Sequence, residues 1–202
     1  MKDIFGGIMT SKTIKIISEE HQALSAMLYS LEMMAKRPSE NTTPSDFEVM
    51  RAMIFYISEF PEKLHHTKES ESLFPMVAAK STEIREVIKE LDEQHAQGEA
   101  AVHNLLSLLV AWEMIGANRQ TAFINEVQKY KEFYLDHMRT EINVVLPVAQ
   151  EVLNADDWEI LDSIFEANQD PLTGHQPSKD FERLFTHVLS NAPDPIGLGK
   201  AH

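Results

Sequence analysis

A histidine–glutamate motif that occurs twice constrains this chain more than any other feature of its sequence. His65 lies four residues before Glu69, His137 lies four residues before Glu141, and a proline follows each Glu six residues later. Residues four apart lie on one face of a helix, with their Cβ atoms about 6 Å apart. Each pair would therefore point into one space, and two such pairs predict one site built from two halves.

Apolar periodicity predicts that both copies of the motif lie on helices. Apolar residues recur at alternating steps of three and four, which is the pattern of a helix with one face in the core. Four such helices are expected, over about residues 13–37, 46–75, 81–116 and 118–153. Pro61 lies inside the second pattern and should kink that helix.

The motif belongs to a longer repeat. His21 lies on the apolar stripe of the first helix and His95 on that of the third, 74 residues apart, and the two histidine–glutamate pairs are 72 residues apart. The residues before these two histidines are also alike, Glu19-Glu20 in one case and Glu93-Gln94 in the other. Two hairpins with one plan and short connections predict an all-α fold, an up-down-up-down four-helix bundle.

Packing the two hairpins together would bring six polar side chains to one level of the core. Iron and manganese accept His and Glu as ligands, and two metal ions about 3.5–4 Å apart would suit four imidazoles and two carboxylates. We expect two histidines on each ion and both carboxylates bridging, with iron the first choice, manganese the second and zinc less favoured. The expected metal ligands are His21, His65, Glu69, His95, His137 and Glu141.

A buried polar network without metal is the alternative interpretation. A lone histidine on an apolar stripe is usually a core residue with one hydrogen-bond partner, but here four helices each contribute one. Two buried carboxylates without a cation would cost several kcal/mol each. Among the neighbours, His66 is expected to flank the site, and His66, Glu99 or Tyr134 would supply a proton or an extra ligand. Gly98 would either admit close helix packing or leave room for a small molecule.

Composition excludes several classes of function. The chain has 202 residues, of which 43% are hydrophobic and 25% charged, so a packed core is expected. A net charge of −14 argues against nucleic acid or an anionic membrane surface as a partner. The absence of cysteine excludes disulfides, iron–sulfur clusters and thiolate chemistry. No signal-peptide pattern or run of about 18 apolar residues occurs, so we expect a soluble cytoplasmic protein.

Three regions are expected along the chain. Residues 1–12 form an N-terminal tail, residues 13–155 the four-helix bundle, and residues 156–202 a C-terminal helix and extended tail. Within the tail, Phe181, Leu184, Phe185 and Val188 predict one short amphipathic helix. We expect that helix to dock on the bundle or on a second subunit, in which case a homodimer would form through the C-terminal region.

The ordered set of histidines and glutamates resembles that of the hemerythrin-like, or HHE cation-binding, family. The resemblance covers about residues 13–153 and includes the Leu-Phe-Pro and Leu-Pro sequences that follow the two glutamates. It implies an up-down-up-down bundle around an oxo- or hydroxo-bridged non-haem di-iron centre. The four stripe histidines would be terminal ligands, and Glu69 and Glu141 would bridge the two irons.

The chain departs from the oxygen-carrying members of that family. Those proteins have a second histidine one turn after the third-helix histidine, where this chain has Glu99. They also end with His, four residues and then Asp, whereas this chain has His137, three residues and then Glu141. The set of four His and two Glu is similar to that of proteins that repair iron centres under nitrosative stress. Those proteins carry a Cys-containing N-terminal segment, whereas this chain has no Cys.

The resulting hypothesis is a di-iron protein that binds or reacts with dioxygen, nitric oxide or hydrogen peroxide, in stress response or in redox or iron sensing. One alternative is a non-enzymatic sensor in which metal binding, coupled to folding, changes how the C-terminal tail meets a partner. Another is a protein of iron-centre repair. A simple iron or manganese store is disfavoured, because the sequence lacks an additional acidic motif in the core.

Overall fold

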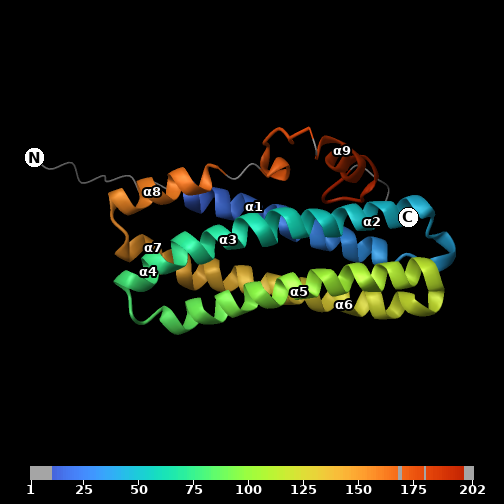
Figure 1. The fold of residues 1–202 in the computed structure, drawn as a ribbon, viewed down its shortest axis with the longest axis horizontal. Helices are drawn as coiled ribbons and strands as arrows, with labels where there is room; N and C mark the ends of the chain where they lie inside the picture. Colours follow the sequence, from blue (N-terminus) through green and yellow to red (C-terminus); the bar gives the residue numbers. More distant parts are fainter. Residues whose placement is uncertain (1–10, 168–169, 180, 198–202) are drawn as a thin grey trace, which may run out of the picture.

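The computed structural model describes residues 11–167, 170–179 and 181–197, and the expectation of an all-helical fold is confirmed. Four long helical runs lie side by side, and successive runs point in opposite directions along the long axis (Figure 1). Most of the expected N-terminal tail and the last five residues of the C-terminal tail lie outside the described residues.

The runs are built from seven α-helices. They are α1 (Lys12–Ala35); α2 (Pro44–Ile57), α3 (His66–Lys68) and α4 (Phe74–Lys80); α5 (Arg85–Ile115); and α6 (Gln120–Thr140) with α7 (Leu146–Val152). Short 3₁₀ segments, Ser39–Asn41 and Ala117–Arg119, lie in the connections. α1 packs against α2 and α6, and α5 packs against the same two helices, so the runs form a closed ring around a common core.

Three π-helical segments widen the second and fourth runs. They are Ser58–His65, Glu69–Leu73 and Glu141–Val145. One proline lies inside the first segment, and another lies two residues after the end of each of the other two segments. A proline lacks the backbone N–H that an α-helix would use, and its ring crowds the preceding turn. Pro61 is thus accommodated in wider turns that continue into α3, and the second run extends beyond Pro75 to Lys80.

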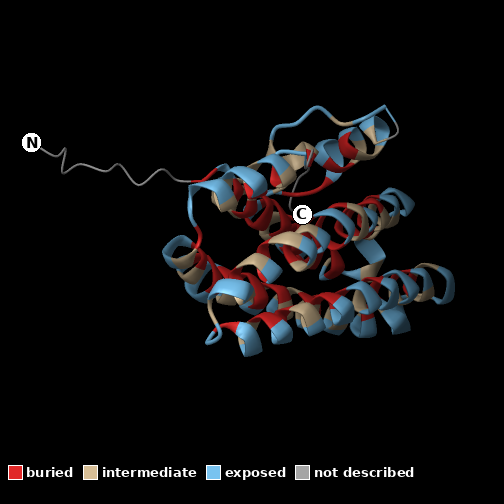
Figure 2. Ribbon diagram, turned by 60° about the vertical axis from the view of Figure 1, so that its left-hand side comes forward, coloured by how far each residue is buried: buried red, intermediate tan, exposed pale blue. Residues whose placement is uncertain are grey.

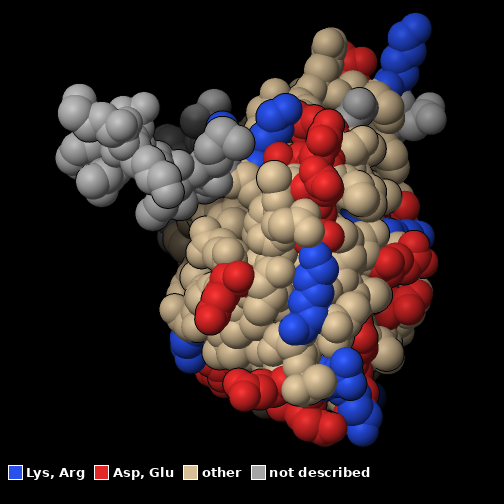
Figure 3. Space-filling model, turned by 90° about the vertical axis from the view of Figure 1, so that its left-hand side faces the viewer, with Lys and Arg blue, Asp and Glu red and all other residues tan. Residues whose placement is uncertain are grey.

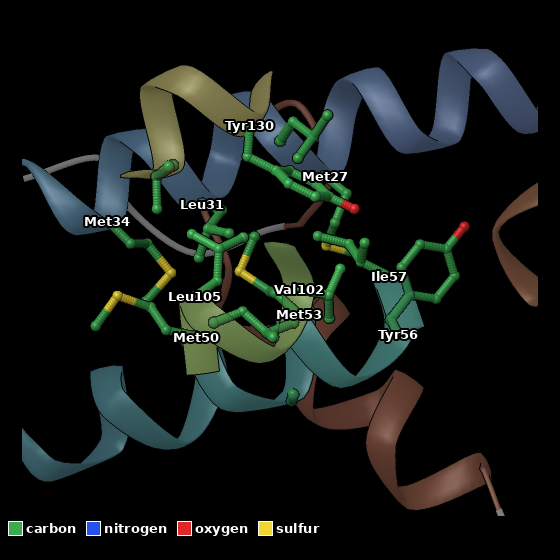
Figure 4. Packing of buried hydrophobic residues seen from close by; sticks show 14 of the residues in the cluster. Met27, Leu31, Met34, Met50, Met53, Tyr56, Ile57, Val102, Leu105 and Tyr130 are labelled. Carbon is green, nitrogen blue, oxygen red and sulfur yellow. The ribbon is translucent and has the colours of Figure 1, made fainter. Parts of the chain in front are cut away.

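Two apolar clusters fill the interior, and a polar layer separates them. On α1, Ile17 belongs to one cluster and Leu24 to the other, so His21 lies between them. Figure 2 shows the buried positions on the inward faces of the helices. Part of the larger cluster is shown in Figure 4, where Met27, Leu31, Met34, Met50, Met53 and Leu105 interdigitate.

Two further helices cover one side of the bundle. α8 (Ala155–Phe165) packs on α1, and α9 (Glu182–Asn191) packs on α2 (Figure 1). Phe185 and Val188 are buried on the inner face of α9. α9 overlaps the stretch for which the sequence predicts a short amphipathic helix, and its buried side chains face α2.

The surface carries charges of both signs. On the end of the bundle shown in Figure 3, basic and acidic side chains are interspersed, and the basic ones do not form a continuous surface. Among the described residues, no helix combines the length and apolar character that a membrane span requires. Cytoplasmic location, the absence of a nucleic-acid partner and the three-part division of the chain stay predictions.

Candidate metal centre

Six side chains from the four runs converge in the polar layer between the apolar clusters. α1 supplies His21, the run from α2 to α4 supplies His65 and Glu69, α5 supplies His95, and the run from α6 to α7 supplies His137 and Glu141. All six are buried, with exposed fractions between 0% and 8%. They are the six residues that the sequence predicts as ligands, and the fold brings them all together.

Their ligand atoms form two groups that share both carboxylates. One group joins His21 and His65 to the two glutamates, and the other joins His95 and His137 to the same glutamates. Within each group the ligand atoms lie within 4.8 Å of one another. The two Nε2 atoms are 3.1 Å apart in the first histidine pair and 3.0 Å apart in the second.

Each carboxylate faces both histidine pairs. Glu141 places Oε2 3.1 Å from Nε2 of His21 and Oε1 3.0 Å from Nε2 of His137. Glu69 likewise places its two oxygens 3.3 Å and 3.6 Å from one histidine of each pair. Each carboxylate therefore turns one oxygen toward each of the two imidazole pairs.

The carboxylates lack the hydrogen bonds that burial normally requires. Among the residues that the structure describes, none forms a hydrogen bond with any of the four oxygens of Glu69 and Glu141 or with Nδ1 of His21. Their ion pairs are with histidines. Buried polar groups are rarely left unsatisfied, and a pair of divalent cations would satisfy all four oxygens. Imidazole and carboxylate donors without sulfur suit iron or manganese.

The residues that precede His21 and His95 each orient a histidine on the neighbouring run. Nδ1 of His65 lies 2.7 Å from Oε2 of Glu20, and Nδ1 of His137 lies 2.8 Å from Oε1 of Gln94. Fixing Nδ1 in this way turns Nε2 toward the centre and sets the orientation of the ring. The repeated sequence context was visible beforehand, but its role was not predicted, because these residues lie off the apolar stripes.

Ser70 plays the corresponding part for His95. Its hydroxyl oxygen lies 2.9 Å from Nδ1 of His95 and 2.5 Å from Oδ1 of Asp92, to which it donates. With the serine proton directed to Asp92, the hydroxyl oxygen is free to accept from Nδ1 of His95. Three of the four stripe histidines are therefore held by a polar group on the side away from the centre.

The two carboxylates titrate differently. Burial raises the pKa of Glu69 to about 7, and the charge of Glu141 acts in the same direction. Burial also works to raise the pKa of Glu141, but His137 and His21 outweigh it and hold that pKa well below its usual value. Burial opposes the protonation of His65, yet the charge of Glu69 raises the pKa of His65 well above its usual value.

A further buried carboxylate, which the sequence analysis missed, lies beside the centre. Glu62 accepts hydrogen bonds from the hydroxyls of Tyr130 at 2.7 Å and Tyr134 at 2.5 Å, and it lies 3.1 Å from Nδ1 of His66. A Cβ atom on Gly98 would come within 1.7 Å of the Tyr134 hydroxyl oxygen. The space that Gly98 leaves is therefore filled by the Tyr134 side chain. Of the two roles predicted for Gly98, this favours close packing and not room for a small molecule.

His66 is buried beside the centre. Its exposed fraction is 3%, and its ring stacks on that of His95 with centroids 4.2 Å apart and an interplanar angle of 12°. Burial lowers the pKa of His66 well below its usual value, which keeps the imidazole neutral. Glu99 and His103, in contrast, are exposed.

Two cavities lead from the surface toward the cluster. One, of about 520 Å³, reaches His21 between α1 and the run from α6 to α7. The other, of about 210 Å³, reaches His66 and His95 and is bordered by Glu71 and Glu99. Both are larger than a diatomic molecule or peroxide, and each is lined by one histidine of a pair, His21 in the first and His95 in the second.

Comparison with known proteins identifies the family. No curated protein and no solved structure matched the chain. The family model described as the hemerythrin HHE cation binding domain matches residues 12–149, a span that contains all six converging side chains. The chain therefore belongs to the hemerythrin family of HHE cation-binding domains.

Proposed function

We propose that this chain is a non-haem di-iron protein that binds or reacts with dioxygen, nitric oxide or hydrogen peroxide. The observation that carries the proposal is a pair of buried carboxylates set between two pairs of imidazoles, with no hydrogen bond from any residue that the structure describes. In this proposal His21 and His65 hold one ion, His95 and His137 hold the other, and Glu69 and Glu141 bridge them. Bound iron would supply an open coordination position and a change of oxidation state.

The chemistry of the donors favours iron, with manganese as the second choice. Zinc in structural sites prefers a closed tetrahedron that usually contains cysteine, and this chain has no cysteine. Two shared carboxylates and neutral imidazoles instead suit octahedral ions that keep a position for a small ligand.

The chain's own residues would serve the site in three ways. Glu20 and Gln94 orient histidines, as their contacts with Nδ1 indicate. Apolar side chains such as Leu24 and Val102 limit the access of water from one side. Tyr134 holds a hydroxyl proton on Glu62 next to the centre, where a bound ligand could draw on it.

The proposal includes a specific architecture. Residues 13–155 would form an up-down-up-down four-helix bundle domain, and residues 156–202 an appended helix and tail. The ring of contacts among α1, α2, α5 and α6 supports this division, as does the docking of α8 and α9 on the outside of the bundle. The family match over residues 12–149 also agrees with it.

Reaction with small ligands tests the proposed function. Protein loaded anaerobically with ferrous ion would be mixed separately with dioxygen, nitric oxide and hydrogen peroxide while its optical spectrum is recorded. We expect a spectral change with at least one of the three, and we expect Glu141→Ala to abolish it because that carboxylate faces both histidine pairs. A loaded protein whose spectrum none of the three changes would contradict the proposal.

A metal-dependent sensor is the second candidate, and one observation favours it. The C-terminal segment inserts Asp170, which is 4% exposed and accepts a hydrogen bond from Tyr56 at 2.6 Å. Asp170 lines the same small enclosed space as His21 and His65. Hydrogen exchange in residues 170–197 should then slow when metal binds, and equal exchange with and without metal would exclude this role.

A further inference from the structure

The outer hydrogen bond of His95 depends on two residues that the repeat does not reproduce. Ser70 directly follows Glu69, and its hydroxyl oxygen lies 2.9 Å from Nδ1 of His95. The same hydroxyl donates its proton to Asp92, three residues before that histidine on α5. The second run and α5 thus give the Nδ1 proton of His95 an acceptor that is itself held in place.

The matching positions beside His21 carry different side chains. Ile142 directly follows Glu141, and Ser18 lies three residues before His21 on α1. Oε2 of Glu141 lies 3.1 Å from Nε2 of His21. Ile142, Ser18 and His21 line one cavity of about 520 Å³. By the repeat, the place that a hydroxyl occupies against His95 therefore corresponds to an aliphatic side chain beside His21.

Nδ1 of His21 differs in its surroundings from the same atom of the other three stripe histidines. It is buried, and no residue that the structure describes forms a hydrogen bond with it. A neutral imidazole carries one N–H, so a metal ion on Nε2 leaves the proton on Nδ1. A buried N–H without an acceptor costs free energy, and metal-binding histidines almost always have an acceptor for it. An aliphatic neighbour in place of that acceptor therefore opposes the bond between His21 and a metal ion.

We infer that Ile142 weakens the bond between His21 and the metal ion that His21 and His65 hold. The inference rests on the proposed function, since it requires a metal ion on Nε2 of His21. Ile142 acts through His21, because its aliphatic side chain offers no acceptor to the Nδ1 proton and does not fix the ring from the outer side. Glu20 acts on the same ion in the opposite sense, through Nδ1 of His65. The residue at position 142 thus sets how readily this ion is released.

Two substitutions of nearly equal shape test this inference. Ile142→Thr supplies an acceptor and Ile142→Val does not, at a position whose side chain is 45% exposed and so tolerates both. Co²⁺ would be titrated into each metal-free full-length chain while the optical absorption is recorded. We expect Ile142→Thr to bind one of two ions about 10-fold more tightly than Ile142→Val, and to release it about 10-fold more slowly to EDTA. Equal affinity and equal release in the two variants would overturn the inference.

The other half of the centre offers the converse test. Ser70→Ala removes the acceptor from Nδ1 of His95, and we expect it to weaken the binding of the other Co²⁺ ion about 10-fold. Ser107→Ala makes the same change at an exposed serine of α5 and should leave both affinities as in wild type. A Ser70→Ala variant with wild-type affinity for both ions would show that the outer acceptor does not matter, and would also overturn the inference.

The wild-type titration separates this inference from the proposed function. If wild type binds two Co²⁺ ions and the two variants at position 142 bind them equally, the role of Ile142 is wrong and the centre stands. If wild type binds no Co²⁺, the centre itself is wrong and the inference falls with it. Circular dichroism of the metal-free variants checks folding. If Ile142→Thr does not fold, Ile142→Ser is compared with Ile142→Val, with the same expectation.

Discussion

The two halves of the centre have the same backbone plan but different charge. In each half, a stripe histidine on one run is followed by a histidine–glutamate pair on the next run. The glutamate is the first residue of a π-helical segment, Glu69–Leu73 in the first half and Glu141–Val145 in the second. In the first half the orienting group is the carboxylate of Glu20, and in the second it is the amide of Gln94.

That difference shows how one sequence repeat can build an asymmetric site. The repeat fixes where the ligands lie, because residues four apart on a helix share a face. The repeat does not make the two carboxylates alike in protonation, because burial and the surrounding charges act on them differently. The pKa of Glu69 is raised to about 7 by burial, whereas His137 and His21 hold that of Glu141 well below its usual value.

Removing ligands gives the largest expected effect, a loss of bound metal that distinguishes a ligand of one ion from a ligand shared by both. His65→Ala should lose one metal ion per chain, because His65 belongs to one of the two ligand groups. Glu141→Ala should weaken both ions, because Glu141 belongs to both groups. Elemental analysis of each purified variant measures this directly, and retention of full metal by both would contradict the assignment.

The two halves also differ three residues after His21 and His95, where the first half has Leu24 and the second has Gly98. Leu24→Ala should lower the free energy of unfolding by about 2–5 kcal/mol, because it leaves a cavity in the core. Gly98→Ala should lower it by about 1–3 kcal/mol, because the new Cβ would collide with Tyr134.

Urea unfolding of the metal-free protein, followed by circular dichroism, measures both changes. Leu106→Ala, at an exposed leucine of α5, is the matched control and should have little effect. A Gly98→Ala variant as stable as wild type would show that Tyr134 can move aside, and the role given to this glycine would be wrong.

Exchanging the orienting groups Glu20 and Gln94 should reduce the difference in metal affinity between the two halves. Glu20→Gln keeps a hydrogen-bond acceptor near His65 but removes its charge, so one ion should bind about 10–100-fold more weakly. Gln94→Glu adds the charge beside His137 and should strengthen the binding of the other ion. Competition titration with Co²⁺ resolves the two binding steps. If neither step changes in either variant, the orienting charge has no influence on the centre.

Metal binding should depend on pH with a definite sign. Burial raises the pKa of Glu69 to about 7. Burial works to lower the pKa values of His65 and His137, but the charges of nearby carboxylates outweigh it and raise both. Metal must displace these protons, so its affinity should fall as the pH drops below about 7, by up to about tenfold per pH unit for each proton released. Titrations at several pH values measure the slope.

The stability of the metal-free protein should fall as the pH rises through the pKa of Glu69, whereas metal affinity should rise. Its folded pKa of about 7 exceeds the ordinary 4.5, so the folded state holds this proton more tightly than the unfolded state does. The stability that Glu69 contributes is full below about 4.5 and is lost as the pH rises through about 7. A Glu69→Gln variant that keeps the same pH dependence of unfolding as wild type would contradict this.

The ligands could be predicted from the sequence because each lies on an apolar stripe. His21 and His95 interrupt stripes of apolar residues, and the two histidine–glutamate pairs repeat at a fixed interval. Helix packing then leaves few places for such side chains except the core.

The groups that surround the ligands could not be predicted in the same way. Glu20 and Gln94 lie one residue off their stripes and reach across to other runs, and Glu62 meets two tyrosines of α6. Contacts between distant helices depend on how the runs are rotated against one another. The π-helical segment around Pro61 changes that rotation, and the sequence indicated only a kink there.

The metal content of the whole chain, purified without a histidine tag or chelator, tests the central claim most directly. Elemental analysis should find close to two iron ions per chain, because two imidazole pairs share two carboxylates that form no hydrogen bonds within the described part of the chain. Two manganese ions would keep the centre and change its chemistry. A chain that binds no metal, even after anaerobic loading with ferrous ion, would show that the six residues form a polar core and would contradict the account.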